Sequence, residues 1–366
     1  MKLFHCLKCN QVLYFENDRC ECCGSQLGFL ASDLQLYPLI QTGDNCFQLY
    51  GGNKDEEYRY CKNHDYNVCN WIIQSNKPNT FCLACQLNRI IPDLSFPEYR
   101  KRWQKIEEAK HRLVYTILRL KLPLINKQQN DSIGLSFNFM ADENISGRDR
   151  VFTGHSNGSI TLNIAEADDV EREQARQSMD EVYRTLLGHF RHEVGHYYWD
   201  RLIDNSSHLD AFRELFGDER QDYLEALKKH YSSGPTAGWR QRYISAYATA
   251  HPWEDWAETW AHYFHIIDTL ETAHSFNISV EPFGDAGLST TINTEPYEQH
   301  DFEIIIKEWL PLTFAMNSLN RGMGLNDLYP FIITTSVKQK LAFIHSICLN
   351  DKEINFVNSD NATIMA

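Results

Sequence analysis

The chain has 366 residues, of which 43% are hydrophobic and 23% are charged, and its formal net charge is −14. This length provides for a small module and one larger domain. The acidic balance argues against nucleic acid as a partner, because binding to phosphates needs an excess of Lys and Arg. No apolar run has the length to cross a bilayer, and residues 1–6 show no signal-peptide core. We therefore expect a cytoplasmic protein without a membrane partner.

The cysteines are concentrated near the N-terminus, and all but Cys348 lie within residues 1–85. Paired Cys-x-x-Cys spacing is typical of structural zinc, which four thiolates hold in a closed tetrahedron. We predict two such sites, formed by Cys6, Cys9, Cys20 and Cys23, and by Cys61, Cys69, Cys82 and Cys85. Disulfide bonds in a secreted protein are the alternative, but the missing signal peptide argues against them.

Two details of the cysteine sites stay open. Cys22 is left over from the first set, and His64 or Cys46 could replace Cys61 or Cys69 in the second set. Imidazole nitrogen and thiolate sulfur both bind zinc, so residue type alone does not decide between them.

Residues 1–95 are predicted to form a zinc-ribbon module of short strands and turns, and residues 96–366 to form a larger domain. The larger domain opens with a long helix, predicted over residues 98–122. Alternation of apolar and polar side chains predicts strands at residues 133–139 and 159–164. We expect these strands to belong to a small antiparallel sheet.

A second helix is predicted over residues 180–203, where apolar side chains recur at helical spacing without a proline. It contains the sequence HEVGH, in which His192 and His196 lie on one face and can bind one zinc ion together. Glu193 is then placed to take a proton from a water molecule on that metal. We interpret His189 as a neighbour of the site or a core histidine, rather than as a fourth ligand.

Two smaller expectations concern the surroundings of this helix. Gly195, inside the motif, is expected to leave room beside the metal. Glu166, Asp168 and Asp169 precede the motif and are expected to place negative charge at the N-terminus of the next helix.

The third zinc ligand is expected from a further helix that begins near Pro252, a residue suited to the first helical position. Glu254 and Glu258 lie one turn apart among aromatic residues, where a carboxylate is costly to bury unless it is paired or binds a metal. One of them can bind zinc while the other hydrogen-bonds a ligand histidine. The residues alone leave open which does so, and an acidic helix start that faces solvent is the alternative.

In this pattern the chain resembles the gluzincin class of metallopeptidases, in which HExxH is followed by a helix with Glu-x-x-x-Asp or Glu-x-x-x-Glu. The resemblance implies that Glu254 binds zinc and that Glu258 supports a histidine. Tyr247, seven residues before Glu254, is similar in spacing to the tyrosine that assists catalysis in lethal-factor-like gluzincins. Its phenol could donate to the oxyanion as it forms, and Tyr243 is an alternative for that role.

Longer strings resemble the bacterial zinc-binding metallopeptidases that join an N-terminal zinc ribbon to a gluzincin-like domain. These strings are RYCKNH (59–64), VCNW (68–71), CLACQLNRIIPDLS (82–95), TGHSNG (153–158), RHEVGHYYW (191–199), HPWEDWAE (251–258) and NSLNR (317–321). The resemblance implies an α+β fold, in which a mainly helical, zincin-like peptidase domain with a small antiparallel sheet follows the zinc-ribbon module.

These observations predict a zinc metallopeptidase that holds three zinc ions, one catalytic and two structural. A peptide or protein would be its substrate, and the zinc ribbon could dock a protein partner. A zinc-dependent amidase or deacylase on a non-protein substrate is one alternative, and a non-catalytic, zinc-stabilised binding protein is another. Glu193 speaks against the second alternative, because a scaffold does not need a general base.

Overall fold

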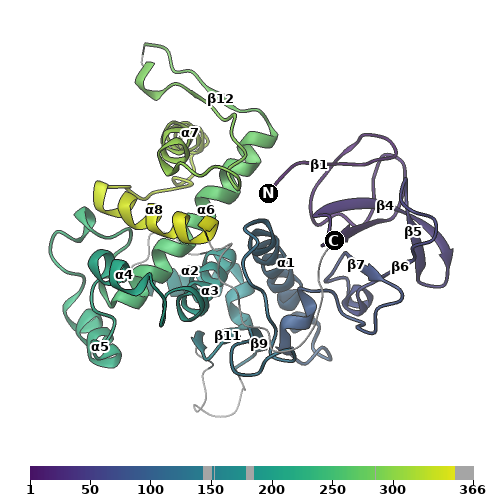
Figure 1. Ribbon diagram of the computed structural model, residues 1–366, viewed down its shortest axis with the longest axis horizontal. Helices are drawn as coiled ribbons and strands as arrows, with labels where there is room; N and C mark the ends of the chain where they lie inside the picture. Colours follow the sequence, from purple (N-terminus) through teal and green to yellow (C-terminus); the bar gives the residue numbers. More distant parts are fainter. Residues whose placement is uncertain (143–150, 152, 179–184, 285, 351–366) are drawn as a thin grey trace.

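The computed structural model describes residues 1–142, 151, 153–178, 185–284 and 286–350. The fold is mixed α+β, with a strand-rich N-terminal part and a larger part in which helices dominate (Figure 1). Within the described residues, no helix combines the length and the apolar character needed to cross a membrane.

The N-terminal part begins with a two-stranded ribbon, β1 (Phe4–His5) and β2 (Val12–Leu13). A closed barrel follows, formed by β3 (Leu27–Leu30), β4 (Gln35–Gly43), β5 (Cys46–Leu49), β6 (Tyr58–Tyr60) and β7 (Trp71–Gln74). The barrel closes because β3 pairs with β4 on one side and with β7 on the other. A Cβ on Gly28 would collide with Ile72 of β7, so glycine permits the closure. The sequence predicted short strands here, but not the barrel.

The larger part contains a four-stranded sheet in the order β10-β11-β9-β8. Its strands are β8 (Asn88–Ile90), β9 (Ser136–Met140), β10 (Gly154–Ser156) and β11 (Ser159–Asn163). The two predicted strands are present as β9 and β11, but the predicted antiparallel arrangement is wrong. β9 pairs in parallel with both β11 and β8, and only β10 and β11 are antiparallel. The chain leaves β9, forms β10 at the sheet edge, and returns in β11 beside β9 in the same direction.

Strand β8 joins the two parts of the chain. It belongs to the first 95 residues, yet Asn88 pairs with Phe137 of β9. The cysteine-rich segment therefore supplies an edge strand to the sheet of the larger part.

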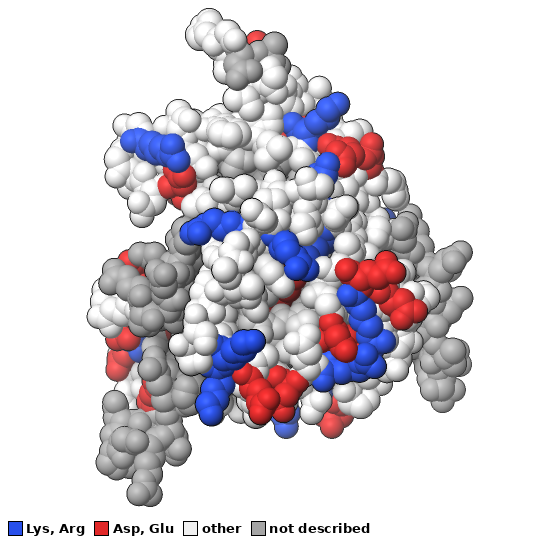
Figure 2. Space-filling view, turned by 90° about the vertical axis from the view of Figure 1, so that its left-hand side faces the viewer, with Lys and Arg blue, Asp and Glu red and all other residues white. Residues whose placement is uncertain are grey.

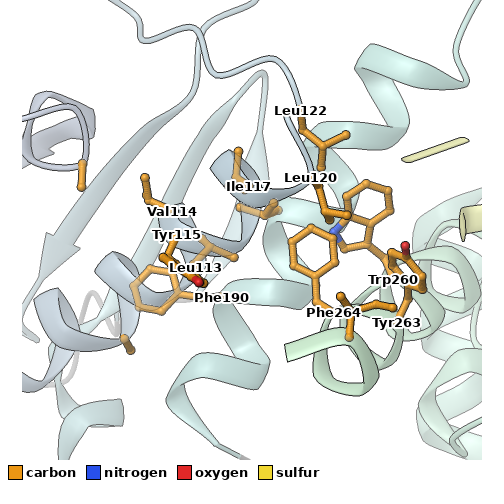
Figure 3. Close-up of a cluster of buried hydrophobic side chains, with 14 of the residues drawn as sticks. Leu113, Val114, Tyr115, Ile117, Leu120, Leu122, Phe190, Trp260, Tyr263 and Phe264 are labelled. Atoms are coloured by element: carbon orange, nitrogen blue, oxygen red, sulfur yellow. The ribbon is translucent and has the colours of Figure 1, made fainter. Parts of the chain in front are cut away.

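Three helices form the core beside this sheet: α1 (Pro97–Arg119), α3 (Leu186–Leu202) and α6 (Pro252–Ser275). Figure 3 shows their buried side chains in contact, with Leu113, Val114, Tyr115 and Ile117 from α1, Phe190 from α3, and Trp260, Tyr263 and Phe264 from α6. The predicted helices over residues 98–122 and 180–203 correspond to α1 and α3. Of the second prediction, residues 180–184 lie outside the described residues.

Shorter elements complete the fold. The remaining α-helices of the described residues are α2 (Asp169–Ser178), α4 (Leu209–Phe216), α5 (Tyr223–Ser233), α7 (Phe302–Gly322) and α8 (Thr335–Asn350). Single 3-10 turns are η1 (Lys62–Tyr66), η2 (Cys85–Leu87), η3 (Ile164–Ala167), η4 (Trp239–Gln241), η5 (Tyr247–Thr249) and η6 (Ala286–Leu288). A small hairpin, β12 (Ser279–Val280) and β13 (Thr290–Thr291), precedes α7.

Candidate metal centre

Three side chains from two helices converge at one point between α3 and α6. The Nε2 atoms of His192 and His196 lie 3.2 Å apart, and Glu254 Oε2 lies 3.0 Å from the first and 3.6 Å from the second. Zinc ligands that lie about 2.0 to 2.1 Å from a tetrahedral ion are about 3.3 Å from one another. The three atoms are therefore spaced as three corners of such a site.

The close approach of α3 and α6 sets this geometry. A Cβ on Gly195 would lie 3.0 Å from Ala257 Cα and 3.2 Å from Trp260 Cβ, so an added methyl group would press the helices apart. The Gly195 carbonyl also accepts a hydrogen bond from the Trp256 indole over 2.8 Å. The expectation that Gly195 leaves room beside the metal is wrong, because α6 fills that space.

The start of α6 places Glu254 in the first helical turn. Pro252 occupies the first turn as predicted, and the His251 side chain caps the helix by accepting a hydrogen bond from the Trp253 backbone N–H over 3.1 Å. The helix therefore begins where the local sequence predicts, with Pro252 in its first turn and His251 as its cap.

Glu254 provides a test of whether the residues fit a cation. It is 1% exposed, and its Oε1 accepts a hydrogen bond from the Tyr223 hydroxyl over 2.6 Å. Its Oε2, the oxygen that faces the two histidines, is buried without a hydrogen-bond partner. A buried carboxylate oxygen without a donor is costly unless a cation satisfies it. The donor set of two imidazoles and one carboxylate therefore fits zinc.

Glu258 lies on the other side of the His192 ring. Its Oε1 is 2.7 Å from His192 Nδ1, while His192 Nε2 faces Glu254. Of the two glutamates, Glu254 is thus grouped with the histidine nitrogens and Glu258 is placed to hold the ring from behind.

The Glu193 carboxylate, on the turn between the two histidines, contacts a further histidine. Its Oε1 lies 3.4 Å from His189 Nε2, and His189 Nδ1 lies 2.5 Å from Glu166 Oε2. Burial by itself raises the pKa of Glu193, but the hydrogen bond from His189 and the neighbouring imidazole rings outweigh burial and lower it. The expected negative charge at the N-terminus of the next helix is present at Asp169, in the first turn of α2. The Glu166 carboxylate is directed instead to His189 and to the Thr153 hydroxyl.

Tyrosines surround the three converging side chains. The ring of Tyr247, in η5, lies 6.0 Å from the His192 ring between centroids. Burial, followed by the Glu254 carboxylate, raises the pKa of Tyr247, so its hydroxyl stays protonated and can donate. The alternative, Tyr243, instead packs under Lys340, whose ammonium is 4.4 Å from the ring centroid.

The sequence contains no sign of the contact between Tyr223 and Glu254, because the two residues are 31 apart and share no motif.

The first cysteine quartet is assembled as predicted from spacing. Cys6 Sγ lies 3.7 Å from Cys23 Sγ, and Cys9 Sγ lies 3.6 Å from Cys20 Sγ. Sulfur atoms about 2.3 Å from a tetrahedral zinc ion would be about 3.8 Å apart. All four lie within 4.8 Å of one another, whereas Cys22 is exposed and outside the group.

The second quartet groups Cys61, Cys69, Cys82 and Cys85. Its sulfur atoms accept backbone hydrogen bonds, from Cys82 N–H to Cys61 Sγ over 3.3 Å and from Trp71 N–H to Cys69 Sγ over 3.4 Å.

Neither alternative ligand of the second set joins it in the described residues. His64 contacts the Cys69 carbonyl over 2.9 Å and stacks on Tyr60, and Cys46 lies in β5 of the barrel. His64 is therefore placed beside the second quartet rather than in it.

Helix α1 meets the second quartet at Cys85. The Cys85 sulfur lies 3.8 Å from His111 Nε2 and 3.8 Å from Glu107 Oε2. The fully buried Lys110 donates to Glu107 over 2.7 Å and to Asn88 of β8 over 2.5 Å. A buried polar network therefore connects this quartet, the strand β8 and the helix α1.

Comparisons with known proteins agree with this description. Residues 99–347 match the family described as "Putative zinc-binding metallo-peptidase", and residues 3–96 match a zinc-ribbon domain. Uncharacterized proteins of Mycobacterium tuberculosis and Mycobacterium bovis are 42% identical over 348 residues, which cover 95% of this chain and 95% of theirs. No solved structure matches the chain. The chain thus belongs to this zinc-binding metallo-peptidase family and carries its zinc-ribbon domain at the N-terminus.

Proposed function

We propose that the protein is a zinc-dependent metallopeptidase that hydrolyses peptide bonds. The observation that carries the proposal is the convergence of His192, His196 and Glu254, with Glu254 Oε2 buried, without a hydrogen-bond donor and directed at the two imidazole rings. Three protein ligands leave one position of a tetrahedral zinc ion for water or substrate, which is the arrangement of catalytic rather than structural zinc.

Each residue of the centre has a proposed role. His192, His196 and Glu254 would hold the zinc, and Glu258 would orient His192 through Nδ1. Zinc, when bound, would supply Lewis acidity towards water and towards the carbonyl of the scissile bond. Glu193 would take the proton from the attacking water and deliver it to the leaving amine. Tyr247 would donate a hydrogen bond to the carbonyl oxygen as negative charge develops there.

The surrounding fold supports a peptide as the substrate. Strand β10 forms the edge of the four-stranded sheet opposite to β8, and its His155 ring lies 6.2 Å from the His196 ring. An edge strand offers unpaired backbone groups to which an extended peptide can add. We propose that this sheet with α3 and α6 forms a zincin-like peptidase domain over residues 96–366, preceded by a zinc-ribbon module over residues 1–95 with two structural zinc ions.

The proposed partners follow from the charge of the chain, and the proposed location follows from its cysteines. Figure 2 shows one face on which Lys and Arg side chains are interspersed with Asp and Glu. Because the formal net charge of the chain is −14, we propose a peptide or protein as partner, rather than nucleic acid, and protein docking at the zinc ribbon. Cysteines without disulfide bonds favour a cytoplasmic location.

The test compares the wild-type protein with Glu193→Gln on a denatured-protein mixture, and new peptide N-termini are detected by mass spectrometry. We expect cleavage by the wild type, a loss of at least about 100-fold in Glu193→Gln with the zinc retained, and no loss in the matched control Glu98→Gln at an exposed position of α1. Hydrolysis of small acylated amides without protein cleavage would favour the amidase alternative. Near-native turnover by Glu193→Gln would exclude the proposed mechanism.

A further inference from the structure

The Glu193 carboxylate is the end of a chain of contacts that continues through His189 to Glu166, and neither His189 nor Glu166 has a role in the reaction proposed above. We propose that His189 is a positioning residue, which holds one carboxylate oxygen of Glu193 in place while Glu166 fixes the His189 ring from behind. This inference rests on the proposed function, because it assigns a partner to the proposed general base.

Both contacts of His189 are nearly shielded from water, and the contact with Glu166 is short. His189 Nε2 lies 3.4 Å from Glu193 Oε1, and His189 Nδ1 lies 2.5 Å from Glu166 Oε2. The two helical residues are four apart on α3, so the imidazole lies directly beside the carboxylate. The side chain of Glu193 is 7% exposed and that of His189 is 17% exposed, which leaves little water to compete for these hydrogen bonds.

Glu166 is itself anchored to the sheet. Its Oε1 accepts a hydrogen bond from the Thr153 hydroxyl over 2.5 Å, and the Thr153 oxygen accepts one from the Asn163 backbone N–H over 3.2 Å. Asn163 is the last residue of β11. The orientation of Glu193 is therefore linked, through His189 and Glu166, to the same sheet whose edge would receive the substrate.

The chemistry of the ring distinguishes this role from metal binding. Both ring nitrogens of His189 face carboxylates, and a histidine that donates from both nitrogens has no lone pair for a metal. Burial alone lowers the pKa of His189, but the Glu166 and Glu193 carboxylates outweigh burial and raise it to about 9. With one Glu193 oxygen facing His189 Nε2, the other oxygen remains for the proton of the attacking water.

The kinetic test uses His189→Leu and His189→Gln beside the wild type. We expect His189→Leu to lower kcat by about 10 to 100-fold, as for other residues that support a catalytic centre, with KM and zinc content unchanged. His189→Gln should recover part of kcat, because its amide N–H can reach Glu193. The control is His5→Gln, an exposed position of β1. Unchanged kcat in His189→Leu would overturn the proposal.

A second test does not depend on turnover. In protein with ¹⁵N-labelled histidines, the His189 signals are assigned by their loss in His189→Gln. We expect Glu193→Gln to shift the His189 Nε2 signal, and Glu166→Gln to shift the Nδ1 signal. If Nε2 does not respond to Glu193→Gln, His189 does not hold the base and the proposal fails. If the wild type cleaves no peptide while Nε2 responds, the proposed function fails but the contact between His189 and Glu193 stands.

Discussion

Glu258 Oε1 lies 2.7 Å from Nδ1 of His192, on the ring nitrogen opposite to the one that faces Glu254. A carboxylate at Nδ1 holds the proton on that nitrogen and leaves the Nε2 lone pair for a metal. Two glutamates one turn apart on α6 thus contact the two nitrogens of a single ring, and their replacement should have different consequences.

Glu254→Ala should abolish tight zinc binding at the His192 and His196 site, because it removes one of three protein ligands. Glu258→Ala should weaken binding by about 10 to 100-fold, the typical effect of losing a residue that orients a ligand. Competition with a chelator measures both affinities. The assignment would be reversed if Glu258→Ala lost the zinc and Glu254→Ala kept it.

The native protein should contain three zinc ions per chain, because two cysteine quartets and one His/His/Glu set have the spacing of zinc ligands. Elemental analysis measures the number. The double change of His192 and His196 to Ala should remove one ion and leave the two in the cysteine sites. A single tightly bound ion in the wild type would contradict this prediction.

Tyr223→Phe should weaken zinc binding at the same centre by about 10-fold or more, because the Tyr223 hydroxyl donates to Glu254 Oε1 over 2.6 Å. The fold should be retained, since only one oxygen atom is removed. Competition with a chelator measures the zinc affinity. Tyr14→Phe is the matched control, because Tyr14 lies in the N-terminal part and is 70% exposed. Equal zinc affinity of the two variants would show that Tyr223 does not support Glu254.

The sequence was sufficient for the parts of the site that depend on local periodicity. His192 and His196 share a helical face because they are four residues apart, and Glu254 and Glu258 share one for the same reason. The Cys-x-x-Cys pairs likewise predicted the first quartet. The two histidines, the two glutamates and each Cys-x-x-Cys pair are separately set within two helical turns or one short loop.

The parts that depend on distant pairing could not be predicted. Tyr223 and Glu254 are 31 residues apart, and Glu166 and His189 are 23 apart, without a shared motif. The strand direction of β9 relative to β11 depends on where β10 is placed, which alternation of side chains does not determine. The barrel closes through pairing of β3 with β7, two short strands that are far apart in the chain.

The buried pair of Lys110 and Glu107 should connect the stability of the second cysteine site to that of α1. Lys110→Met would leave Glu107 buried without its cation, at a cost of about 3 to 5 kcal/mol. We expect a lower denaturation midpoint and faster zinc release from the second quartet, because Glu107 Oε2 lies 3.8 Å from Cys85 Sγ. A chromogenic chelator measures the rate of release.

Two variants test this interpretation of Lys110. The double variant Lys110→Met with Glu107→Gln should recover part of the lost stability, because it removes the unpaired charge. Lys105→Met is the matched control, because Lys105 is also a lysine of α1. The ion pair of Lys105 with Asp169 is exposed and should contribute little to the free energy of unfolding. If Lys105→Met and Lys110→Met released zinc equally fast, the buried network would not stabilise the site.

Gly195→Ala should destabilise the protein and weaken zinc binding, because its Cβ would lie 3.0 Å from Ala257 Cα in α6. Overpacking typically costs about 1 to 3 kcal/mol, which the better helix propensity of alanine, about 1 kcal/mol, offsets only in part. Gly322→Ala is the matched control, since this glycine is also helical and no atom lies within 4 Å of its Cβ position. The control should raise the denaturation midpoint slightly, whereas Gly195→Ala should lower it and reduce zinc retention. Equal behaviour of the two alanine variants would show that close packing of α3 on α6 does not set the metal geometry.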